Sequence, residues 1–170
     1  EDMKLTLAKS SGFCFGVDHA VKTAYACLNN LDRKMPTYML GEITHNEHVV
    51  SDLLSRNLLL VHNTDEIIPN STVMIRAHGI SPAVREKLIK KNCDIIDCTC
   101  PYVEKIHKIV READKKGYGV LIAGANGHPE VEGICGECNG DYHVISSEEE
   151  LDRIPLADKN WILVSQTTFS

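Results

Sequence analysis

Several features that would place a sequence in a familiar functional class are missing from this one. No apolar run approaches the ~18–20 residues that span a bilayer, and no secretory leader is recognisable, so we expect a cytoplasmic protein. There is no basic run and the net charge is −6, which argues against nucleic acid or an acidic membrane as the main partner. The Walker-type phosphate loop, the GxGxxG fingerprint and the GxSxG elbow are also absent, so no nucleotide-binding or serine-hydrolase signature guides the assignment.

Cysteine, in contrast, is well represented, with seven residues. An odd number fits poorly with a closed disulfide framework. In a cytoplasmic protein, such cysteines more often bind metal, take part in catalysis or lie in the core. The cysteine content therefore predicts a metal or a redox cofactor in preference to a disulfide scaffold.

The order of the hydrophobic patterns indicates the fold class. Short β-branched runs alternate with amphipathic stretches, which predicts an α/β fold with mainly parallel sheets. Strands are expected over residues 5–8, 38–40, 58–61, 73–75, 94–97, 120–123 and 161–164. Helices are expected over residues 17–31, 49–54, 82–91 and 101–116. Ser81 followed by proline is the expected N-terminal cap of the third helix.

A faint internal repeat predicts two similar small α/β units, residues 1–97 and 98–170. Three residues of the first unit recur about 85 residues later in the second. The pairs are Cys14 and Cys100, His45 and His128, and His78 and Thr167. Extended once more, the repeat places another cysteine at about residue 186, in a third unit that is missing from this chain.

Each of these six residues follows a predicted strand, and five of them lie at a strand-to-helix junction. The carboxyl ends of the strands in an open α/β sheet line one crevice, and ligands bind there. Thiols are soft metal ligands, and imidazoles suit both metals and anions. The arrangement therefore predicts a metal or cluster site beside an anion site.

Cys14 and Cys100 are the candidate metal ligands. Each precedes a predicted helix, where the helix dipole stabilises a thiolate. Cys14 lies between two glycines, although a small hydrophobic residue packed in a turn would also account for it. Cys98 is so close to Cys100 that only one of the two is expected to face the crevice, and Cys98 is assigned to the interior. Cys27 and Cys93 are also expected in the core.

Cys135 and Cys138 form a C-x2-C pair, which is a zinc-binding spacing. A structural zinc site needs four ligands, and no second pair of this spacing completes one. We expect the two thiols on one helical turn, with one of them buried. An alternative is a non-catalytic zinc-binding or redox-sensing domain that combines this pair with Cys98 and Cys100.

Three histidines are candidate anion ligands: His45, His78 and His128. Imidazole N–H groups beside open helix N-termini are suited to phosphate oxygens. One such histidine would ordinarily be a local cap or a core group, but three at equivalent junctions favour a binding site. The other histidines are expected to be ordinary surface or helix residues: His19, His48, His62, His107 and His143.

Glu130, Gln166 and Thr167 are polar residues expected near the same edge. Glu130 falls in the first turn of a helix, where an anion is favoured for structural reasons alone. In a crowded anionic site its pKa would rise instead, and it would hold and deliver a proton. Gln166 and Thr167 end the last strand, where they would orient a substrate or relay a proton. Glu132 is expected to point elsewhere.

Six short motifs occur together and in order along the chain. They are Gly-Phe-Cys-Phe-Gly-Val-Asp at 12–18, His-Asn at 45–46, Ala-His-Gly at 77–79, Thr-Cys-Pro at 99–101, Gly-His-Pro-Glu-Val-Glu-Gly at 127–133 and Gln-Thr-Thr at 166–168. With them, the sequence resembles the 4-hydroxy-3-methylbut-2-enyl diphosphate reductase family of the non-mevalonate isoprenoid pathway, from residue 5 to its end. The motif at 127–133 is very specific.

The resemblance implies a three-unit α/β protein with a central [4Fe-4S] cluster held by three cysteines. Cys14 and Cys100 match two of these cluster ligands. The cluster would bind the allylic hydroxyl of the substrate, and a ferredoxin or flavodoxin would supply single electrons. The implied reaction is the reductive dehydroxylation of 4-hydroxy-3-methylbut-2-enyl diphosphate to isopentenyl and dimethylallyl diphosphate.

The residues that match the substrate site of the family have distinct implied roles. Glu130 matches the carboxylate that delivers a proton, and Thr167 matches the hydroxyl that orients the substrate's alcohol. Gln166, next to it, is assigned to substrate binding. The residues that match the diphosphate contacts are His45, His78 and His128.

The chain departs from the family in its length. The third unit of the family, with the third cysteine and a Ser-x-Asn diphosphate contact, has no counterpart here. Two thiolates hold a four-iron cluster poorly, so the 170 residues alone are expected to be inactive, with the cluster absent or labile. A third interpretation, a diphosphate-binding protein without any metal, also stays open at this stage.

Overall fold

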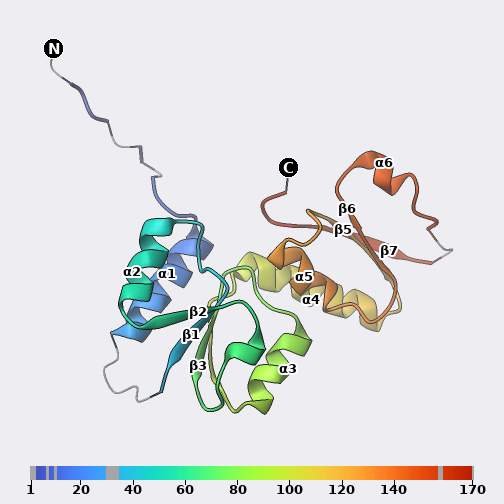
Figure 1. Cartoon of the computed structure of the whole chain (residues 1–170). Helices are drawn as coiled ribbons and strands as arrows, with labels where there is room; N and C mark the ends of the chain where they lie inside the picture. The colour runs from blue at the N-terminus through green and yellow to red at the C-terminus, as the bar shows by residue number, and fades with distance from the viewer. Residues whose placement is uncertain (1–2, 7, 10, 30–34, 157–158, 170) are drawn as a thin grey trace.

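Two β-sheets, each built of parallel strands, form the framework of the protein. The computed structural model describes residues 3–6, 8–9, 11–29, 35–156 and 159–169 (Figure 1). The first sheet has the strand order β2-β1-β3-β4, and the second has the order β6-β5-β7. Neighbouring strands run parallel in both sheets. The predicted α/β class with mainly parallel sheets is therefore confirmed.

The first sheet contains a reversal of strand order at its centre. Its strands are β1 (Thr37–Leu40), β2 (Leu58–Val61), β3 (Thr72–Ile75) and β4 (Asp94–Asp97), which match the predicted ones. The chain passes from β1 outward to β2 and then crosses back to β3, so the direction reverses between β1 and β3. Leu40 pairs with Ile75 at this point. Ligands bind preferentially outside the carboxyl ends of strands at such a switch point.

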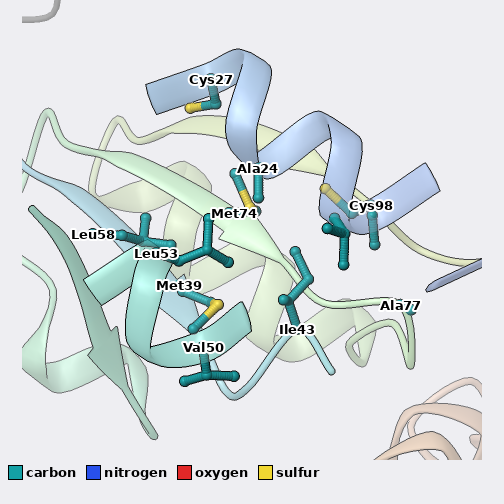
Figure 2. Packing of buried hydrophobic residues seen from close by; sticks show 12 residues of the cluster. Ala24, Cys27, Met39, Ile43, Val50, Leu53, Leu58, Met74, Ala77 and Cys98 are labelled. Atoms are coloured by element: carbon teal, nitrogen blue, oxygen red, sulfur yellow. The ribbon is translucent and has the colours of Figure 1, made fainter. Parts of the chain in front are cut away.

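Helices cover both faces of this sheet. They are α1 (Phe15–Leu28), α2 (Glu47–Ser55) and α3 (Pro82–Lys90). Successive strand residues point to opposite faces, so Met39 and Met74 pack with α1 and α2, whereas Tyr38 and Val73 pack on the face of α3. Figure 2 shows the first of these cores, to which α1 and α2 both contribute side chains together with Met39 and Met74.

The second sheet has its own core. Its strands are β5 (Gly119–Ala123), β6 (Tyr142–Ile145) and β7 (Trp161–Ser165). The remaining helices are α4 (Pro101–Lys115), α5 (Pro129–Cys135), the short α6 (Glu148–Leu151) and the 3-10 turn η1 (Thr64–Glu66). Val110 of α4 and Ile134 of α5 pack against Val120 and Ile122 of β5. Helices α4 and α5 therefore cover one face of the second sheet (Figure 1).

Local sequence signals account for several helix ends. The Ser81 hydroxyl accepts a hydrogen bond from the Val84 N–H, and proline occupies the first position of α3, as predicted. Asn46 caps α2 in the same way through the Val49 N–H. Helix α4 begins at a proline and stops just before Gly117, whose φ of 73° suits a residue without a side chain.

The first predicted strand is wrong. Residues 5, 6 and 8 are described and form no strand, and Leu5 is 88% exposed. This segment runs away from the body of the protein (Figure 1). An extended segment becomes a strand only by pairing with a neighbour, and the strand pairings that the structure describes all join other segments. Cys14 thus precedes a helix without following a strand.

Two further points concern the limits of the helices. Helix α1 was expected to reach residue 31, but it ends at Leu28, and Leu31 lies outside the described residues. Within the described ranges, none of the helices is both long and apolar enough to cross a membrane.

Candidate functional site

Three histidines from loops of the two sheets lie close together. His45 follows β1 and His78 follows β3, so both lie at the switch point of the first sheet. Their ring centroids are 5.9 Å apart. His128, the N-cap of α5 after strand β5 of the second sheet, places its ring 5.2 Å from that of His78 and nearly perpendicular to it. The structure thus brings all three predicted anion ligands together, with His78 in the middle.

His78 is held in its neutral form. Burial lowers its pKa to about 4, and the positive charges of Arg76, His128 and His45 add to the effect. Its Nδ1 atom is buried and has no hydrogen-bond partner among the described residues. A buried polar atom without a partner is costly. The centre of the cluster therefore has an unused hydrogen-bonding position.

His128 also caps α5. Its Nδ1 accepts a hydrogen bond from the Glu130 N–H at 3.1 Å, so in the neutral ring the proton is on Nε2. The same short segment therefore orients one imidazole and fixes the start of the helix that carries Glu130.

Glu130 and Thr167 form a close pair. Glu130 is only 1% exposed. Its two carboxylate oxygens accept hydrogen bonds from the Thr167 N–H at 2.7 Å and from the Thr167 hydroxyl at 2.8 Å. The pairing joins α5 to the end of β7, which lie 37 positions apart in the sequence. Because Thr167 is exposed, the pair connects a buried carboxylate to the surface.

Gln166 uses its side-chain amide within the protein. Its Oε1 accepts a hydrogen bond from the Ala125 N–H at 3.0 Å, and its Nε2 donates to the Thr168 hydroxyl at 2.9 Å. The side chain is buried and ties the end of β7 to the loop after β5. Its visible role is to shape the loops that carry Thr167.

The two candidate metal ligands occupy equivalent positions. Cys14 is the N-cap of α1 and Cys100 the N-cap of α4, and neither thiol makes a capping hydrogen bond. The two helix starts are in contact, since a Cβ atom on Gly16 would lie 2.5 Å from the Cys100 Sγ. Cys14 is exposed and Cys100 half-buried. Cys98 is fully buried as expected, and desolvation raises its pKa to about 12.

The donor chemistry suits an iron–sulfur group only in part. Two free thiols at adjoining helix N-termini are appropriate ligands for iron. Within the described residues, however, no group of three or more metal-binding side chains is placed to hold a metal ion. Cys14 and Cys100 therefore provide part of a ligand set.

The expectation for the C-x2-C pair is wrong. Helix α5 ends at Cys135, so Cys138 lies beyond it, and both side chains are half-buried. Both pack against the core of the second sheet, whereas Cys98 and Cys100 belong to the core beneath α1 and α2. Burial raises the pKa of Cys138 to about 12. The four cysteines of the zinc hypothesis thus lie in separate cores.

His107 was expected to be an ordinary surface or helix residue; it does lie on helix α4, but its burial was not predicted. It is 2% exposed, and its Nδ1 lies 2.8 Å from the Glu137 Oε1. The sequence contained a signal for this burial, because His107 falls four residues after Val103 and three before Val110, on the apolar face of α4. No comparable pattern in the sequence predicted the burial of its partner, Glu137.

Comparisons with known proteins agree on one family. A family model described as LytB protein matches residues 5–170. The 4-hydroxy-3-methylbut-2-enyl diphosphate reductase of Alkaliphilus oremlandii is 41% identical over 99% of this chain, and that of Thermoanaerobacter sp. is 40% identical over 98%. The chain covers 59% and 58% of these two relatives, less than two thirds of their length.

Two solved structures are similar to this chain. The structure of the E-1-hydroxy-2-methyl-but-2-enyl-4-diphosphate reductase from Plasmodium falciparum matches 94% of the chain with a TM-score of 0.88 and 32% identity. A structure of (E)-4-hydroxy-3-methyl-but-2-enyl diphosphate reductase matches 95% of it with a TM-score of 0.82 and 37% identity. The chain covers 50% and 57% of these two structures.

Proposed function

The chain belongs to the LytB protein family, and on this premise we propose that it forms the diphosphate-binding and proton-delivering part of a 4-hydroxy-3-methylbut-2-enyl diphosphate reductase. The observation that carries the proposal is the meeting of His45, His78 and His128 from two units at one edge. The curated relatives that carry this enzyme name are longer than the chain, so the activity of the complete protein is part of the proposal.

The three imidazoles would bind the diphosphate of the substrate. His78 is neutral near pH 7, since its pKa is about 4, so it can donate one hydrogen bond and accept another. His128 already uses Nδ1 for the Glu130 N–H, which leaves its Nε2–H as the available donor. A bound diphosphate would supply the acceptors that such N–H groups lack. Its negative charge would also favour protonation of the three imidazoles.

Glu130 and Thr167 would deliver a proton to the hydroxyl that leaves. The Thr167 N–H can only donate, so it must bond to an unprotonated oxygen of Glu130. The Thr167 hydroxyl can donate or accept, so the same 2.8 Å contact also suits a protonated second oxygen. A proton held on Glu130 can therefore pass through the Thr167 hydroxyl toward the exposed side of the pair.

Cys14 and Cys100 would provide two thiolates for an iron–sulfur cluster. When bound, such a cluster would supply electrons one at a time and an iron site for the substrate oxygen. The third thiolate would come from outside the two units proposed here, residues 1–97 and 98–170. A ferredoxin or flavodoxin in the cytoplasm is the electron donor that fits this chemistry.

The experiment is anaerobic purification of the complete protein that contains this chain, followed by iron and acid-labile sulfide analysis. Cys14→Ser and Cys100→Ser should each lower iron and sulfide sharply. Cys135→Ser, which alters a half-buried thiol in the other core, is the matched control and should retain them. Bound zinc without sulfide would support the zinc-binding alternative and contradict the proposal.

The second part of the experiment is binding of inorganic pyrophosphate. Replacing His78 by alanine should weaken binding by about tenfold or more, because a positioned hydrogen bond to a charged group is lost. Replacing the exposed His62, which is outside the histidine cluster, should leave the affinity unchanged. Equal affinities for the wild type and the His78 variant would contradict the assignment of the diphosphate site.

A further inference from the structure

A buried polar network lies close to Gly79, the residue that follows His78. The side chains of His107 and Glu137 are each 3% exposed, and their Nδ1 and Oε1 atoms are 2.8 Å apart. The same Glu137 oxygen accepts a hydrogen bond from the Arg111 Nη1 at 2.7 Å. A carboxylate oxygen that already accepts from a guanidinium is an acceptor toward the imidazole as well, so His107 donates through Nδ1–H. Both residues are absent from the proposed reaction.

The opposite edge of the His107 ring faces the two segments that carry the site. A Cβ atom on Gly79 would lie 3.5 Å from the His107 Cε1 and Nε2, and one on Gly133 would lie 3.2 Å from both. Gly79 directly follows His78. Gly133 is on α5, three residues after Glu130. The ring edge therefore lies close to both the loop that carries His78 and helix α5.

The burial of this ring edge indicates a spacing role. The His107 Nε2 atom is buried and makes no hydrogen bond with the described residues, and the same is true of the Glu137 Oε2. Such atoms are tolerated when their position is dictated by other requirements. A Cβ atom added at Gly133 would meet the ring edge at 3.2 Å, tighter than an ordinary contact, whereas one at Gly79 would meet it at 3.5 Å, an ordinary van der Waals distance. The ring edge is therefore close to both backbones, with less than a methyl group's room at Gly133. A ring displaced toward Gly133 would press on α5, and removal of the ring would leave space beside both segments.

We infer that His107, clamped by Glu137 and Arg111, is a positioning residue that sets the distance between the His78 loop and helix α5. The inference rests on the proposed function, because this distance determines how His78 and His128 share one diphosphate. It also places Glu130 relative to the bound substrate. His107 touches neither the substrate nor the cluster cysteines in this assignment and acts through the two backbones beside its ring edge.

The first test replaces His107 by asparagine in the complete protein that contains this chain. Asparagine keeps a donor near the Nδ1 position, and so the bond to Glu137, but removes the ring edge. The dissociation constant for inorganic pyrophosphate should rise about tenfold. Val110→Ala is the matched control, because it truncates a fully buried residue of the same helix that contacts the core of the second sheet. It should lower stability without changing the affinity.

The second test adds a methyl group on the other side of the contact and keeps His107. Gly133→Ala pushes on the ring edge and should raise the dissociation constant about threefold. In combination with His107→Asn, the methyl occupies space that the ring has vacated, so the double variant should bind better than His107→Asn alone. Gly140→Ala is the control, since its added methyl would meet only the Asp114 Oδ1, at 3.5 Å. Additive losses in the double variant would overturn the inference.

A readout without ligand separates this inference from the proposed function. The imidazole NMR signals of His78 and His128 depend on the edge-to-face arrangement of the two rings and should shift in His107→Asn but not in Val110→Ala. If the wild type binds no pyrophosphate, the proposed function fails, and the NMR signals still decide the positioning role. Unchanged signals in His107→Asn and Gly133→Ala, or equal shifts in Val110→Ala, would overturn it.

Discussion

Replacing Glu130 by glutamine should abolish proton delivery while preserving the structure of the site. Glutamine has nearly the same shape as glutamate, and its oxygen can still accept from the Thr167 N–H. Its NH₂ group can donate to the Thr167 hydroxyl, which then rotates to act as an acceptor. Both hydrogen bonds are kept, but the amide has no proton to transfer.

The magnitudes follow from this geometry. Hydrogen bonds to a charged group contribute about 1.5–3 kcal/mol each and neutral ones about 1 kcal/mol. Part of the difference is offset because a buried carboxylate costs more to desolvate than an amide. We therefore expect Glu130→Gln to lower the free energy of unfolding by about 1 kcal/mol. Glu130→Ala leaves a cavity and a Thr167 N–H without its partner, and should cost about 2–4 kcal/mol.

Activity should respond far more strongly than stability. Loss of a general acid lowers turnover by about 10²–10⁴-fold, so kcat for substrate reduction in the complete protein should fall by at least about a hundredfold in Glu130→Gln. Affinity for pyrophosphate should stay within about twofold, since Glu130 is outside the imidazole cluster. Glu132→Gln alters an exposed acid on the same helix and is the matched control. A Glu130→Gln enzyme with more than a tenth of wild-type turnover would refute the proton-delivery assignment.

Three further outcomes are expected. Between pH 6.5 and 4 the unfolded chain binds more protons at His78 than the folded one does, because the folded pKa is about 4. The free energy of unfolding should therefore decrease as the pH is lowered from 6.5 to 4. The fall should reach at most about 3 kcal/mol, measured as the difference between wild type and His78→Asn in urea titrations at pH 7 and pH 4. Gly16→Ala should lower iron retention strongly, because its methyl group would sit 2.5 Å from the Cys100 Sγ. Ser81→Ala removes the bond to the Val84 N–H and should cost about 1 kcal/mol in urea unfolding.

Each of these has its own contrary result. A pH profile of His78→Asn that runs parallel to that of the wild type would contradict the low folded pKa. For Gly16, the control is Gly12→Ala, where an added methyl meets no atom within 4 Å, although φ there is positive. Equal iron loss in the two glycine variants would mean that close packing on Cys100 is not the cause. For Ser81, a threonine should restore stability, because its hydroxyl caps equally well.

Much of the framework could be predicted from the sequence because the signals are local. The strand of residues 73–75 is an apolar run in the sequence. Ser81 followed directly by a proline marks the start of α3, and all the residues that form this cap lie within four positions of one another. The apolar run of residues 5–8 carried the same signal and was misread. Nothing local reveals whether a run finds a sheet edge, since hydrogen-bond partners in a parallel sheet come from distant segments.

The same distinction between local and long-range interactions applies to the candidate site. The sequence by itself determined which cysteines and histidines lie at the ends of helices and strands, because these ends depend on residues that are adjacent in the sequence. Only the tertiary structure decided that His128 reaches His78, that Glu130 meets Thr167 and that His107 is buried against Glu137. These contacts join segments tens of residues apart, and their distances are set by how two separately packed cores rest against each other.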